Sequence, residues 1–218
     1  MALRRRRAAT TPMLYRLCSL LLEYPDEELR AGREELAGAV RELPRSEAAD
    51  ALEQFCEWWA GEDPLALEQH YVETFDLHKR CGLYVTFYGE GDKRDRGPAL
   101  LRLKRLYRAA GLPLEGTGEL PDYLPVMLEF AALAPDGKGE IVLREHRAAI
   151  ELLRQGLHDR GTPYARVIDA VSLAVGELSP ADRARALKLA ASGPPQELVG
   201  LEPFTPPEIV HSGGEARR

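Results

Sequence analysis

Cysteine is scarce in this sequence, and long apolar runs are missing. The only cysteines among the 218 residues are Cys18, Cys56 and Cys81, an odd number with no CxxC pair. A disulfide framework and a cysteine-based zinc site are therefore not expected, and three reduced thiols fit a cytoplasmic protein. No segment approaches the ~20 consecutive apolar residues of a transmembrane helix, so direct membrane insertion is not expected either.

The sequence motifs of several enzyme classes are also missing. There is no GxxxxGK[ST] loop, no GxSxG elbow and no HExxH helix, and Gly89-Glu90-Gly91 is too short a match to a dinucleotide-binding loop. A metal site in a helical bundle needs several glutamates and Glu-x-x-His pairs from different helices, and none of the helices we expect carries such a pair. We therefore predict a protein that is not an enzyme and has no metal or other cofactor. The rival interpretation is a helical metalloprotein that uses His70 and Glu73.

Charge is unevenly distributed along the chain. The formal net charge is −6, although residues 4–7 are four consecutive arginines; outside that run, 25 basic residues stand against 35 acidic ones. An export signal is not expected, because Arg16 interrupts the apolar run that follows and Glu23 ends it. An acidic body disfavours binding to nucleic acid and suits a basic peptide better.

Four capping residues followed by proline predict helix starts. These pairs are Thr11-Pro12, Asp63-Pro64, Thr162-Pro163 and Ser179-Pro180, and each precedes an apolar period of helical type. The pattern predicts an all-α protein: a single helical bundle domain of about nine to eleven helices over residues 11–192. Residues 1–10 are expected to form a basic N-terminal tail and residues 193–218 a mobile C-terminal tail. Residues 83–88 are β-formers without a hairpin partner, so we expect either a helix or an extended connector there.

Two segments carry unusual polar residues. Residues 93–108 are rich in arginine and lysine, which indicates either the solvated face of a helix or an anion site built on Arg94, Arg102 and Arg105. Residues 119–125 read Glu-Leu-Pro-Asp-Tyr-Leu-Pro. Here Pro121 is expected to begin a helix, with Asp122 in its first turn.

Several runs in order resemble the NarJ family of nitrate reductase molybdenum cofactor assembly chaperones, within the redox-enzyme maturation chaperones. The runs are residues 70–77, 82–88, 91–97 and 119–125 with 128–130, and residues 14–17 and 21–25 also fit. The likeness spans about residues 13 to 180. Tyr123 stands where relatives outside this branch often have histidine, so a nucleotide-binding role is not carried over from them.

The resemblance implies an all-helical chaperone that binds the N-terminal peptide of the catalytic subunit of a respiratory nitrate reductase. Such a chaperone holds the apoenzyme in the cytoplasm for molybdenum cofactor insertion before membrane docking. Molybdenum cofactor biosynthesis proteins are further candidate partners.

A helical client peptide needs an apolar groove and a few orienting charges. We expect the groove at Tyr71, Phe75, Tyr84 and Tyr88, next to Pro121 and Tyr123, with orienting charges from Glu119, Asp122 and Glu129. The alternative function is a helical cofactor- or nucleotide-binding module that uses the basic helix 93–108.

Overall fold

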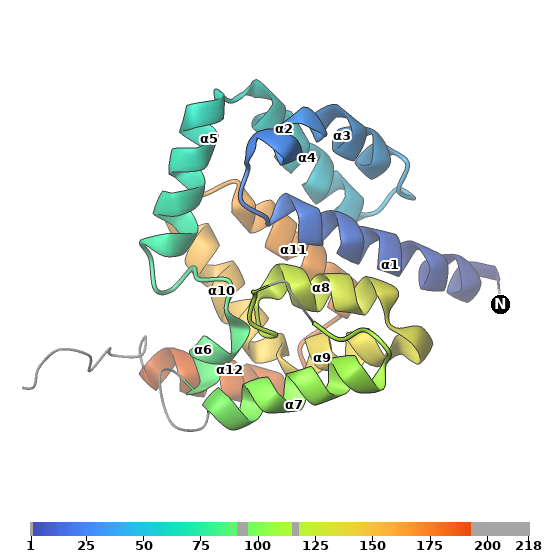
Figure 1. Cartoon of the computed structure of the whole chain (residues 1–218), viewed down its shortest axis with the longest axis vertical. Helices are drawn as coiled ribbons and strands as arrows, with labels where there is room; N and C mark the ends of the chain where they lie inside the picture. Colours follow the sequence, from blue (N-terminus) through green and yellow to red (C-terminus); the bar gives the residue numbers. More distant parts are fainter. Residues whose placement is uncertain (1, 91–95, 115–117, 193–218) are drawn as a thin grey trace, which may run out of the picture.

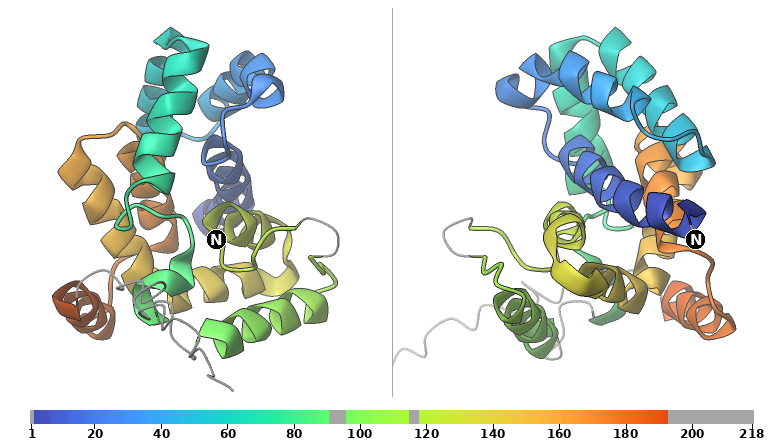
Figure 2. Two further views of the ribbon diagram at one scale, coloured as in Figure 1. Left: turned by 60° about the vertical axis from the view of Figure 1, so that its left-hand side comes forward. Right: turned by 90° about the vertical axis from the view of Figure 1, so that its right-hand side faces the viewer.

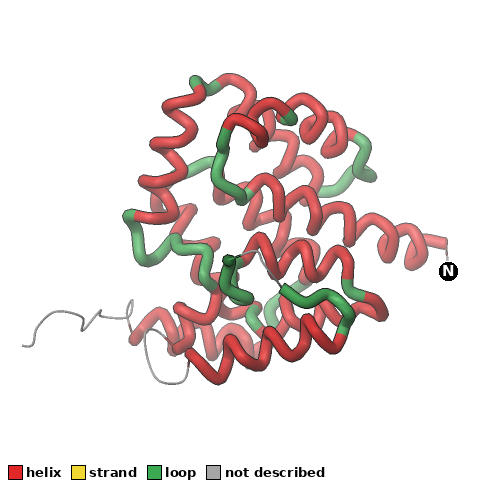
Figure 3. Tube along the Cα trace, in the orientation of Figure 1, coloured by secondary structure: helices red, strands yellow, loops and turns green. Residues whose placement is uncertain are grey.

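The computed structural model describes residues 2–90, 96–114 and 118–192, and the regular structure in these ranges is helical (Figures 1 and 3). The α-helices are α1 (Ala2–Leu21), α2 (Glu27–Ala31), α3 (Arg33–Arg41), α4 (Glu47–Gly61), α5 (Pro64–Tyr71), α6 (Val85–Glu90), α7 (Arg96–Ala109), α8 (Leu124–Leu133), α9 (Lys138–Glu145), α10 (Arg147–Arg160), α11 (Tyr164–Val175) and α12 (Pro180–Ser192). A π-helix, Val72–Asp76, continues α5, and a 3-10 turn, Pro135–Gly137, leads into α9.

The expected all-α class is confirmed. The described residues form twelve α-helices, of which α2 and α6 are only five and six residues long. These two short helices account for the difference from the expected number. The domain boundaries at residues 10 and 192 stay predictions, and residues 193–218 lie outside the described part of the chain.

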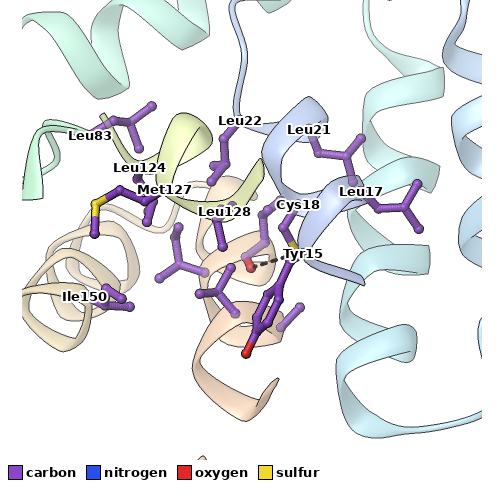
Figure 4. Close-up of a cluster of buried hydrophobic side chains, with 14 of the residues drawn as sticks. Tyr15, Leu17, Cys18, Leu21, Leu22, Leu83, Leu124, Met127, Leu128 and Ile150 are labelled. Atoms are coloured by element: carbon purple, nitrogen blue, oxygen red, sulfur yellow. Dashed lines mark hydrogen bonds between the residues drawn. The ribbon is translucent and has the colours of Figure 1, made fainter. Parts of the chain in front are cut away.

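The core is centred on α1, which packs against α8 and α11 (Figure 4). Leu14, Leu17 and Leu21 recur at helical spacing on α1 and are all buried, as the apolar period predicts. Helix α4 covers the other side of α11, and α10 packs on α11 as well. Helices α2–α5 lie at one end of the molecule and α7 and α12 at the other (Figures 1 and 2).

Three of the four predicted helix starts are confirmed. Asp63 accepts from the backbone N–H groups of Leu65 and Ala66, and Ser179 exchanges hydrogen bonds with Asp182 in a capping box. Thr162 accepts from the N–H of Tyr164. The start predicted at Pro12 is wrong, because α1 begins at Ala2 and Pro12 lies inside it. The preceding residues are mostly alanine, leucine and arginine, which are strong helix formers.

The structure also shows the conformations of residues 83–88 and 119–125. Leu83 lies in a bend, Tyr84 forms a β-bridge and α6 begins at Val85, so a short non-helical connector is followed by a helix within residues 83–88. The helix start predicted at Pro121 is wrong: Pro121 and Asp122 form a turn, Tyr123 is the N-cap, and α8 begins at Leu124 with Pro125 in its first turn. Pro125 rather than Pro121 occupies the position whose N–H has no helical partner.

None of the helices in the described ranges is both long and apolar enough to cross a bilayer.

Candidate functional site

Two segments far apart in the sequence are joined by a short antiparallel contact. The N–H of Val85 donates to the carbonyl of Asp122 at 2.9 Å, and the N–H of Leu124 donates to that of Leu83 at 2.8 Å. Tyr84 and Tyr123 pair as an isolated β-bridge, with their ring centroids 5.3 Å apart. The contact therefore fixes the start of α6 against the start of α8.

Tyrosine hydroxyls continue from this contact into the body of the protein. The hydroxyl of Tyr71 donates to the carbonyl of Leu22 at 3.0 Å, so it accepts from the hydroxyl of Tyr123, 3.1 Å away. Tyr24 packs edge-on against Tyr71 with a centroid distance of 5.4 Å. Tyr24 is 42% exposed and Tyr84 36%, which makes them accessible to a partner, whereas Tyr71 is buried.

Carboxylates surround these rings. Burial, together with the charges of Glu119 and Glu129, raises the pKa of Glu23 to about 6. Glu119 is exposed and its charge adds to burial in raising the pKa of Tyr84, and Glu129 is half-buried and pairs with Arg16. We call the set Tyr24, Tyr84, Tyr123, Glu23, Glu119 and Glu129 the tyrosine–carboxylate surface.

Asp122 has a different place from the one expected. It is fully buried in the turn before α8, and its side chain contacts the first turn of α6. Its Oδ2 accepts from the hydroxyl of Thr86 at 2.6 Å and from the N–H of Thr86 at 3.3 Å, and it faces Arg96 at 3.4 Å. A client peptide could therefore meet Asp122 only after the segment moves, and its orienting role stays a prediction.

The other expected groove residues divide by burial. Phe75 lies in the core, 6% exposed, with its ring 4.8 Å from those of Tyr71 and Tyr164. Pro121 is buried, and its carbonyl accepts from the hydroxyl of Tyr107 at 2.7 Å. Tyr88 is partly buried, with its hydroxyl held at 2.9 Å from two backbone carbonyls. Of the expected set, the structure thus brings only Tyr84, Glu119, Tyr123 and Glu129 together at the surface.

The expected anion site lies on a separate helix. Arg102 and Arg105 are exposed on α7, whereas Arg94 lies outside the described residues. Arg102 lines a pocket of about 340 Å³ with His146 and Arg185, but its guanidinium pairs with Glu145, which also lines that pocket. A carboxylate in this position opposes a bound anion, so the pocket does not favour the cofactor- or nucleotide-binding alternative.

The proposed metal pair receives no support from the geometry. His70 is half-buried and hydrogen-bonds Thr162 at 2.7 Å. Burial lowers its pKa below the ordinary value. In the part of the chain that the structure describes, no group of three or more His, Cys, Asp and Glu side chains is placed to hold a metal ion.

Sequence reasoning missed three residues of this region: Glu23, Tyr24 and Arg96. All three lie in runs that carry the family resemblance, at residues 21–25 and 91–97. The interactions that bring them to this region are mostly long-range: Arg96 pairs with Asp122, Tyr24 packs on Tyr71, and Glu23 lies near the charges of Glu119 and Glu129. Such distant contacts leave no local pattern in the sequence.

Comparison with known proteins places the chain among nitrate reductase proteins. The family model for the nitrate reductase delta subunit matches residues 41–169. The probable nitrate reductase molybdenum cofactor assembly chaperone NarJ of Bacillus subtilis is 39% identical over 158 residues, which are 72% of this chain and 85% of that protein. The chain belongs to the nitrate reductase delta subunit family.

Other relatives extend the comparison. The assembly chaperone NarJ of Escherichia coli K12 is 35% identical over 70% of this chain and 65% of its own length. The nitrate reductase-like protein NarX of Mycobacterium tuberculosis is also 35% identical, but this chain spans only 24% of it. A crystal structure of a putative redox enzyme maturation protein from Archaeoglobus fulgidus shares the fold, with a TM-score of 0.57 at 24% identity over 74% of this chain and 91% of that one. The family expected from the sequence is thereby confirmed.

Proposed function

We propose that this protein is an assembly chaperone that binds the N-terminal peptide of a nitrate reductase catalytic subunit on the tyrosine–carboxylate surface. The observation that carries the proposal is the gathering of partly exposed Tyr24, Tyr84 and Tyr123 with Glu23 and Glu119 where α1, α6 and α8 meet. The names of the relatives, which are nitrate reductase molybdenum cofactor assembly chaperones, support the assembly role.

The chemistry of the surface suits a basic amphipathic helix. Tyrosine rings offer large apolar faces at a low cost in conformational entropy, and their hydroxyls remain able to hydrogen-bond. Burial and the nearby Glu119 raise the pKa of Tyr84, so this hydroxyl stays protonated at neutral pH. The apolar side of the peptide would pack on the rings, while its lysines and arginines meet the carboxylates.

The role that follows is binding without catalysis. The chaperone would hold the apoenzyme in the cytoplasm while the molybdenum cofactor is inserted, and would release it before membrane docking. Molybdenum cofactor biosynthesis proteins are candidate further partners in this role. In this proposal the protein is not an enzyme, because it acts through a peptide complex alone.

Calorimetry with a synthetic peptide of the catalytic subunit's N-terminus tests the proposal. We expect saturable binding with one peptide per chain and none with a peptide in which each basic residue is replaced by glutamate. Leu101→Ala serves as the surface control: it truncates an exposed residue of α7 that is not part of the tyrosine–carboxylate surface, and it should bind the peptide like the wild type. Wild-type protein that ignores the native peptide, or binds both peptides equally, would contradict the proposal.

A further inference from the structure

Arg96 connects the basic helix α7 to the tyrosine–carboxylate surface. It is the first residue of α7, and its side chain is only 20% exposed. Its Nε donates to the hydroxyl oxygen of Thr86 at 3.3 Å, and its Nη2 donates to Oδ2 of Asp122 at 3.4 Å. One guanidinium therefore joins both segments of the antiparallel contact.

The same guanidinium also faces two aromatic rings. Its central carbon lies 5.9 Å from the ring centroid of Tyr84 and 6.0 Å from that of Phe87. A cation at this distance from an aromatic face is attracted by the electron-rich ring. The ring of Tyr84 thus lies between the guanidinium of Arg96 and the ring of Tyr123.

Asp122 explains why a cation is needed here. Its carboxylate is fully buried, and its Oδ1 accepts no hydrogen bond from the described residues. A buried carboxylate without a compensating charge is costly. Arg96 supplies the only cation paired with Asp122 among the described side chains.

We infer that Arg96 is a positioning residue for client binding: it neutralises Asp122 and holds the ring of Tyr84 beside Tyr123 as one wall of the peptide site. The inference rests on the proposed function. Arginine suits this role better than lysine, because a planar guanidinium can donate in two directions and still lie over a ring. A lysine ammonium would keep the charge but lose this geometry.

Two effects of Arg96 can be separated by experiment. Arg96→Ala removes the cation paired with the buried carboxyl group of Asp122, so both the melting temperature and the peptide affinity should fall. In Arg96→Ala/Asp122→Asn the buried charge is gone, and the amide oxygen can still accept from Thr86. We expect this double variant to regain most of the lost melting temperature but to bind the synthetic client peptide about tenfold more weakly than Asp122→Asn alone.

Two further variants sharpen the test. Arg96→Lys should keep near-wild-type melting yet bind the peptide more weakly. Arg105→Lys, an exposed change on the same helix, should bind like the wild type. An affinity in the double variant equal to that of Asp122→Asn, or wild-type affinity in Arg96→Lys, would overturn the inference, because charge compensation alone would then be the role of Arg96.

A measurement without peptide separates this inference from the proposed function. Tyrosines are replaced by 3-fluorotyrosine, and the fluorine resonance of Tyr84 is assigned by its loss in Tyr84→Phe. We expect that resonance to move in Arg96→Ala/Asp122→Asn relative to Asp122→Asn. If the wild type does not bind the peptide but the resonance moves, the proposed function fails and the positioning of Tyr84 stands. An unmoved resonance overturns the positioning whether or not the peptide binds.

Discussion

Two groups of aromatic residues meet at the junction of α5 and its π-helical continuation, and they differ in what surrounds them. One group is packed around Tyr164, which contacts Phe55 at 5.1 Å and Phe75 at 4.8 Å between ring centroids. The other group is the tyrosines around Tyr123, whose hydroxyls meet each other, a carbonyl and carboxylates. Tyr71 belongs to both, since its ring contacts Phe75 and Tyr164 while its hydroxyl faces Tyr123.

The comparison shows that aromatic spacing alone does not identify a binding site. Tyr71 and Phe75 are four residues apart, yet both are buried. The residues that reach the surface come from other segments, Tyr24 after α1 and Tyr84 before α6. In the proposed site the rings keep a polar end near solvent, whereas a ring that is wholly covered, such as that of Phe75, belongs to the core.

The largest expected effect is on the core side of the comparison. Phe75→Ala removes a buried ring and should lower the free energy of unfolding by about 3–5 kcal/mol, measured by urea denaturation. Phe75→Leu, which retains more of the volume, should cost clearly less. If Phe75→Ala instead keeps wild-type stability and loses peptide binding, Phe75 belongs to the peptide groove and our division of the aromatic residues is wrong.

On the surface side, truncating Tyr123 should act mainly on binding. Tyr123→Ala is expected to weaken the binding free energy of the synthetic client peptide by about 1–3 kcal/mol in calorimetry. The ring is partly exposed beside Tyr84 and is the expected anchor. Tyr123→Phe removes only the hydrogen bond to Tyr71 and should cost about 1 kcal/mol or less. Equal losses in the two variants would show that the hydroxyl, and not the ring, carries the contact.

A smaller effect should appear in the pH dependence, through Glu23. Its folded-state pKa is raised to about 6 from an ordinary value of 4.5, so its protonated form is favoured in the folded protein. The stability that this group contributes is present below about pH 4.5 and is lost as the pH rises through 6. Glu23→Gln should therefore raise the melting temperature at pH 7.5 relative to wild type, and the difference should shrink towards pH 4.5.

The affinity for the peptide should depend on pH in the opposite direction from the stability of the protein. A basic peptide favours the ionised carboxylate, so the affinity of the wild type should increase as the pH rises through about 6. The same increase in Glu23→Gln would show that Glu23 is not the group responsible for the pH dependence of binding.

The smallest expected effect is that of one exposed carboxylate. Glu119→Gln should slow association of the basic peptide by a few-fold at low ionic strength, and the difference should shrink near 0.1 M salt, where charges are screened over about 10 Å. Arg105→Gln, on exposed α7, is the matched control and should leave the association rate unchanged. If Arg105→Gln speeds association by as much as Glu119→Gln slows it, the rate reports long-range attraction by the net charge of the whole protein and not a local role of Glu119.

Local chemistry in the sequence was sufficient to predict the helical class. Capping by Asp63, Thr162 and Ser179 involves residues two or three positions further on, and the stripe of α1 repeats within a single helix. The same local reasoning was wrong at Pro12 and Pro121. A proline is compatible with more than one position near a helix start, and the flanking residues and packing select among them.

The sequence by itself determined the helices, the acidic character and, through its resemblance, the family. Only the tertiary structure decided that Asp122 caps α6 and pairs with Arg96, that Phe75 is core, and that Glu23 and Tyr24 join the surface. The physical reason is range. Helix propensity, capping and apolar period act within about one turn of chain, whereas burial and ion pairing depend on which distant segments pack together.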